Sequence, residues 1–144
     1  MLSGFSNISE FFNKSIRKLN FKDVQVALKS QDYIIINTLM ASEQDCLIKN
    51  TLPYEQEEKV INDLLNGYDL GVKKFVVYGK NGCDESAEKK YRQLLTLGFS
   101  CVYLYAGGLF EWMLLQDIYG ADEFPTTRKV LDILRFSGAP TLYK

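Results

Sequence analysis

Short apolar runs alternate with longer mixed segments along the middle of the chain. Residues 33–37, 75–78 and 102–105 are compact runs rich in β-branched and aromatic side chains, typical of strands covered on both faces. Residues 54–65 and 86–97, which lie between these runs, have the apolar spacing of helices. This alternation predicts an α/β domain of three layers with a mainly parallel sheet of four to five strands and right-handed crossovers.

Start and stop residues mark the ends of the expected helices. Pro53 and Gly67 bracket the helix between the first two strands, and Gly98 follows the helix between the second and third. Asn20 can cap an earlier helix that ends near Ser30. The helix boundaries therefore agree with the boundaries of the apolar runs.

The first 19 residues have the pattern of an amphipathic helix. Apolar side chains recur there at spacings of three and four, at Phe5, Ile8, Phe12, Ile16 and Leu19. Such a stripe must be covered, and we expect the helix to pack on the surface of its own domain. A mitochondrial presequence and a membrane-surface helix are the alternatives, and Glu10 counts against both.

The last third of the chain contains one strongly apolar helix and a tail. Residues 109–119 are apolar all round and stop at Gly120, which predicts a helix that is buried or clamped between other parts of the fold. We expect a single domain over residues 1–144, with a helical extension over 1–19, a core over 20–119 and a tail over 120–144 that wraps the domain.

Composition and charge limit the classes of partner. The chain has 144 residues, of which 47% are hydrophobic, enough for one core, and its net charge is −1. With a net charge this close to zero, the protein as a whole has no positive potential that would attract nucleic acid or an anionic membrane. No segment reaches the roughly 18 consecutive apolar residues of a membrane span. We expect neither a nucleic-acid partner nor a transmembrane segment.

Histidine is absent and cysteine is sparse. The lack of histidine excludes Ser-His and Cys-His nucleophilic pairs and histidine-containing zinc sites. Cys46, Cys83 and Cys101 are an odd number without CxxC spacing, which disfavours a disulfide framework or a thiolate metal site. We expect no metal, no cofactor and a reducing compartment, the cytoplasm, with a mitochondrial location as the alternative.

The loop after the second strand is the candidate site. Ligands of open α/β sheets bind at the carboxyl ends of the strands, where backbone N–H groups and a helix start are exposed. The predicted anion cradle consists of Gly79, Lys80, Asn81, Gly82, Cys83, Asp84, Glu85 and Ser86. Two carboxylates against a single lysine oppose an anionic ligand there.

This region resembles the C-terminal half of a rhodanese-like domain. The matching features are the strand 75–78 with its loop, Gly98-Phe99, Val102, Gly107-Gly108 and Trp112. The resemblance implies a rhodanese fold and places the family's nucleophilic cysteine, which carries sulfur as a persulfide, at the position of Gly79. The loop also lacks the arginine that the related dual-specificity phosphatases use for phosphate.

A vacant nucleophile position predicts a catalytically inactive member that serves as a binding or regulatory module. The ligand would be an unidentified protein partner or a small anion, and exposed Tyr54, Tyr103 or Tyr105 could form the recognition surface.

Cys83 supports an alternative interpretation. It lies four residues after the vacant position and near the start of the next helix, where a thiolate can be stabilised. The chain would then be an atypical sulfurtransferase or a thiol redox protein. The simpler interpretation is an incidental loop cysteine beside Asp84 as the helix cap, because neighbouring carboxylates oppose a thiolate. Cys101 is expected to be a small core residue, and Cys46 to be structural or incidental.

Overall fold

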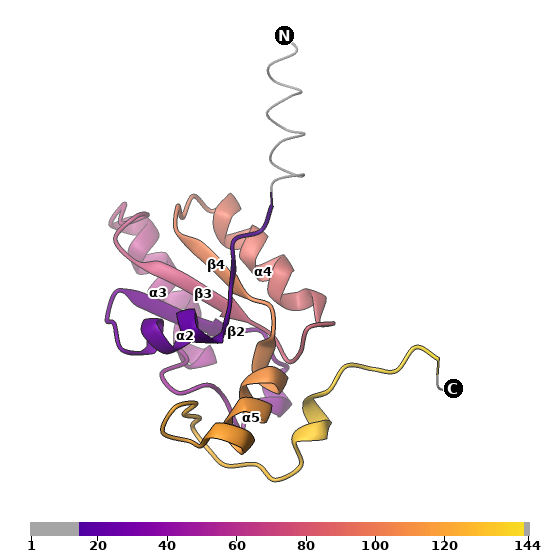
Figure 1. The fold of residues 1–144 in the computed structure, drawn as a ribbon. Coiled ribbons are helices and arrows are strands. Elements are labelled where there is room, and N and C mark those ends of the chain that lie inside the picture. Colours follow the sequence, from indigo (N-terminus) through magenta and orange to yellow (C-terminus); the bar gives the residue numbers. More distant parts are fainter. Residues whose placement is uncertain (1–14, 143–144) are drawn as a thin grey trace.

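Four parallel strands form one sheet in the computed structural model, which describes residues 15–142 (Figure 1). The spatial order is β1–β4–β3–β2, and the strands are β1 (Lys18–Leu19), β2 (Tyr33–Asn37), β3 (Lys74–Tyr78) and β4 (Val102–Tyr105). A parallel bridge between Ile35 and Thr51 extends the pairing beside β2. The predicted α/β class and the mainly parallel sheet are confirmed.

Two pairs of helices cover the two faces of the sheet. The helices are α2 (Phe21–Leu28), α3 (Tyr54–Asn66), α4 (Glu85–Thr96) and α5 (Gly108–Tyr119), with short 3₁₀ turns η1 (Ala41–Glu43) and η2 (Ile133–Phe136). Val76 and Tyr78 of β3 join a buried cluster with residues of α2 and α5, whereas Phe75 and Val77 join one with residues of α3 and α4. Both faces of β3 are therefore buried, which explains its continuous apolar sequence.

Local signals place most helix ends where the sequence predicts them. The Asn20 side chain accepts hydrogen bonds from the N–H groups of Lys22 and Asp23 and caps α2. Gly67 follows α3 as its C-cap. Gly98, just after α4, has a φ of +109°, a conformation that favours glycine.

The N-terminal prediction needs correction. Most of the helix predicted over residues 1–19 lies outside the described residues, but Lys18–Leu19 form a strand that pairs with β4. Ile16 packs against the α3/α4 cluster and Leu19 against the α2/α5 cluster, on opposite faces of the sheet. The segment is a strand because its backbone N–H and C=O groups pair with the free edge of β4. This long-range pairing is not visible in the local spacing of apolar residues.

The α5 prediction is correct in extent but wrong in burial. Trp112 is fully buried, but Leu114, Ile118 and Tyr119 are exposed, so one side of the helix faces outward. The tail after α5 passes along one end of the domain, beside α5, and then leads away from it (Figure 1), and its Phe136 is buried in the α2/α5 cluster. Within residues 15–142, no helix combines the length and hydrophobicity needed to cross a bilayer.

Candidate functional site

Residues 79–84 join the carboxyl end of β3 to α4, and the last two residues of the predicted cradle, Glu85 and Ser86, lie in the first turn of α4. The start of α5 lies against this loop. The N–H group of Leu109 donates to the carbonyl oxygen of Gly79 at 2.9 Å. Gly108 has a φ of +70°, and a side-chain carbon there would lie 2.8 Å from the same oxygen. Glycine at position 108 therefore permits the close approach of the loop and α5.

Gly79 stands at the position where the resemblance places the nucleophile. It is buried, and a side-chain carbon built on it would lie 2.8 Å from Oδ2 of Asp84 and 3.2 Å from Cβ of Ala87. The first of these separations is shorter than side-chain carbons normally tolerate. A larger residue at position 79 therefore requires the Asp84 side chain to move.

The Asp84 carboxylate occupies the interior of the loop. Its Oδ2 accepts a hydrogen bond from the Lys80 N–H group at 3.0 Å, and its Oδ1 accepts from the N–H group of Ser86 at 2.9 Å and from its hydroxyl at 2.6 Å. Burial acts to raise the pKa of Asp84, but the hydrogen bonds from Lys80 and Ser86 outweigh it, and the pKa is lowered. The predicted cradle thus holds a negative charge that belongs to the protein.

The lysine of the loop is also paired. The Lys80 ammonium lies 2.5 Å from Oε2 of Glu43 in η1, and both side chains are about one-third exposed or less. The cation that would attract an anion to the loop is therefore already neutralised by a carboxylate from a distant part of the sequence.

The tail crosses the loop beside Cys83. The Asn81 amide donates to the carbonyl oxygen of Phe136 at 2.9 Å, while its oxygen accepts from the Cys83 N–H group at 2.9 Å. Cys83 is exposed, but its sulfur lies 3.1 Å from where a side-chain carbon on Gly138 would stand. The thiol therefore borders the tail rather than the interior of the loop.

The other two cysteines lie away from the loop. Cys46 is fully buried, and its thiol donates to the Arg128 carbonyl oxygen at 3.1 Å and contacts the Met113 sulfur at 3.7 Å. Burial raises the pKa of Cys46. Cys101 is half-buried just before β4. Neither is in hydrogen-bond contact with the loop in the described part of the chain.

Sequence reasoning missed the residues that close the loop from elsewhere in the chain, Glu43 and Phe136. Phe136 ends an apolar run in the tail, and such a run can predict that part of the tail packs on the core. Glu43 carried no signal, because its partner is 37 positions away. Among the tyrosines considered for a recognition surface, Tyr54 is 60% exposed, whereas Tyr105 is buried.

The chain is similar in fold to several solved structures. No family model and no curated protein matches the sequence. The Alr3790 protein from Anabaena matches with a TM-score of 0.56 at 20% identity, over 81% of this chain and 97% of that one. A structure described as the Rhodanese_3-like domain of Alr3790 matches at 22% identity, with a TM-score of 0.46, over 67% of this chain and 99% of that one.

A functionally described structure is also similar. The As-Sb reductase from Leishmania major matches with a TM-score of 0.51 at 14% identity, over 73% of this chain and 79% of that one. The present chain therefore shares its α/β fold with the Alr3790 protein, which is consistent with the rhodanese-like fold that the sequence predicts. At these identities the likeness establishes the fold alone.

Proposed function

We propose that this protein is a catalytically inactive rhodanese-like domain that serves as a binding or regulatory module. The observation that carries the proposal is the position of the Asp84 carboxylate. It accepts three hydrogen bonds inside the loop, and its Oδ2 lies 2.8 Å from where the first side-chain carbon of a residue at position 79 would stand. A persulfide or a phosphate would meet a fixed negative charge instead of free N–H donors.

The similar reductase does not alter this conclusion. The Leishmania major protein is described as an As-Sb reductase, and it is only 14% identical to this chain. Gly79 has no nucleophile to offer at the position implied by the resemblance, and Lys80 is paired with Glu43. The similarity of fold, together with the loop that this chain carries, supports a protein that has kept the α/β fold but not a catalytic activity at the loop.

Cys83 remains the alternative, because its thiol is exposed. An atypical sulfurtransferase or thiol redox protein would use it as the nucleophile. Against this, the loop positions no lysine or arginine on the thiol in the described residues, and Asp84 and Glu85 follow it directly. Three free cysteines are consistent with the reducing compartment, the cytoplasm, that we propose.

Intact-mass analysis tests the choice between these functions. The reduced protein is incubated with thiosulfate or with a persulfide donor and then mapped by peptide mass. We expect no added sulfur on any cysteine. Added sulfur that maps to Cys83, disappears in Cys83→Ser and persists in Cys101→Ser would overturn the proposal and establish the alternative.

A further inference from the structure

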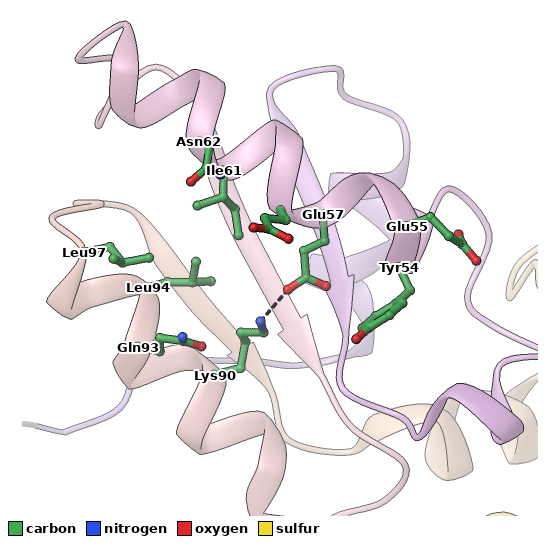
Figure 2. A pocket seen from close by; sticks show the side chains of 10 residues that line it. Tyr54, Glu55, Glu57, Ile61, Asn62, Lys90, Gln93, Leu94 and Leu97 are labelled. Atoms are coloured by element: carbon green, nitrogen blue, oxygen red, sulfur yellow. Dashed lines mark ion pairs between the residues drawn. The ribbon is translucent and has the colours of Figure 1, made fainter.

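A groove lies between α3 and α4, on the face of the sheet opposite α2 and α5. Figure 2 shows its larger hollow, of about 390 Å³, lined by residues of both helices. A second hollow of about 340 Å³ reaches Thr38 and Ser86 near the carboxyl ends of the strands. The two hollows share the residues Tyr54, Glu57, Lys90 and Gln93, so they form one continuous groove, here called the α3–α4 groove.

A buried carboxylate stands in the wall of this groove. Glu57 is 8% exposed, and Figure 2 shows its side chain pointing toward Lys90, with which it forms an ion pair. Within residues 15–142 no other donor contacts this carboxylate, although two oxygens can accept several hydrogen bonds. A nearly buried carboxylate with one partner has remaining capacity for a cationic donor from outside.

The charged residues that line the groove favour a cationic ligand. The groove carries three carboxylates, those of Glu55, Glu57 and Glu58, and two ammonium groups, those of Lys89 and Lys90, which leaves one negative charge in excess. Its other lining residues are mainly apolar or uncharged. The excess favours a cation over an anion.

Aromatic and apolar side chains add shape to the charge. Tyr54 is 60% exposed at one end of the larger hollow, and Leu97 is 41% exposed at the other (Figure 2). Ile61 and Leu94 lie between them. A guanidinium group can stack on a tyrosine ring while it donates to a carboxylate, and its aliphatic stem packs on leucine or isoleucine.

We propose that the α3–α4 groove binds a peptide segment of a partner protein through an arginine side chain that reaches Glu57 beside Tyr54. The inference rests on the proposed binding function and names its surface and the chemistry of its partner. Apolar residues that flank the arginine pack on Ile61, Leu94 and Leu97.

A peptide titration followed by NMR tests the inference on the full-length chain. The probe is acetyl-Leu-Arg-Leu-amide, and the matched probe carries citrulline, which keeps the shape of arginine without its charge. We expect the arginine probe to shift amide signals of α3 and α4 at concentrations up to about 10 mM. The citrulline probe should bind at least about fivefold more weakly.

Three variants assign the effect to the groove. Glu57→Gln should weaken the arginine probe at least about fivefold, and Tyr54→Ala, an exposed position that tolerates change, should weaken it as well. Glu88→Gln is the matched control, because Glu88 belongs to an exposed pair with Arg92 on the same helix outside the groove, and it should leave binding unchanged.

Several outcomes overturn the inference. These are equal binding of both probes, no shifts at α3 and α4, shifts confined to residues 79–86, or groove shifts that depend on protein concentration without peptide, which assign the groove to a second copy. Failure here leaves the proposed function standing, since that is decided by sulfur loading. Conversely, sulfur on Cys83 refutes the inactive module whatever the peptide does.

Discussion

Two carboxylates, Asp84 in the strand-end loop and Glu57 in the α3–α4 groove, have opposite relations to their surroundings. Asp84 accepts three hydrogen bonds from its own loop, from N–H groups and a hydroxyl within four residues. Glu57 has one partner in the described residues, the Lys90 ammonium, although it is the more buried of the two. The carboxylate of the loop thus has its hydrogen bonds supplied by the loop itself, whereas the carboxylate of the groove can still accept one from a ligand. The end of the strands, where ligands of α/β folds usually bind, is therefore less suited to a ligand here than the α3–α4 groove.

The strongest disruption of the closed loop should come from Phe136→Ala. Phe136 is 1% exposed, and we expect the free energy of unfolding to fall by about 3–5 kcal/mol because a cavity forms in the α2/α5 cluster. Urea denaturation measures the loss, and a thiol reagent should modify Cys83 faster. Leu134→Ala, in the same turn but 70% exposed, should stay within about 0.5 kcal/mol. Equal losses in both variants would show that the tail does not anchor at Phe136.

A cysteine at position 79 tests the contact between this position and the Asp84 carboxylate. Gly79→Cys should lower the free energy of unfolding by about 1–3 kcal/mol, because its side chain meets the Asp84 carboxylate. The double variant Gly79→Cys with Asp84→Ala should lose less than the sum of the two single changes, since removal of the carboxylate relieves the contact. Urea titration of the four proteins gives the coupling. Additive losses would exclude the contact as the cause.

Removal of the internal anion alone should have a smaller effect. Asp84→Ala loses the α4 cap and the bond to Lys80, and we expect about 1–2 kcal/mol less stability at neutral pH. Because the folded pKa of Asp84 is lowered, this difference is complete above the ordinary carboxyl pKa and is lost as pH falls through the lowered value. Glu85→Ala, the neighbouring exposed carboxylate, is the control. A difference that grows toward acid pH would contradict this account.

Cys83→Ser should have the least effect. The thiol is exposed, and the Cys83 backbone keeps its bond to Asn81, so stability should change by less than about 0.5 kcal/mol. Thermal or urea unfolding checks this. A loss near that of Asp84→Ala would mean that the sulfur contact with the tail at Gly138 contributes to closure of the loop.

Local features were readable from the sequence, whereas long-range ones were not. Asn20, Gly67 and Gly98 act within a few residues of themselves, so their caps and stops fall where predicted. The spacing of apolar residues around Lys18–Leu19 predicts a helix, yet pairing with β4, more than 80 residues away, makes this segment a strand.

The candidate site divides in the same way. Its position after β3 and the absence of a nucleophile at Gly79 followed from the order of residues. The inward turn of Asp84 and the contact between Asn81 and Phe136 depend on side-chain direction and on a tail 55 positions away. The groove is not evident from the sequence, because Glu57 lies in a run of acidic residues that is typical of a solvent-exposed helix face.

The burial of Phe136 also sets the limit to which the chain can be shortened. A version that stops after α5 at Tyr119 would remove a side chain that fills the core and the carbonyl that holds Asn81. A version that stops after Gly138 would keep both. Expression and crystallisation work on this domain should therefore count η2 as part of the folding unit, even though no strand or longer helix follows α5 within the described residues.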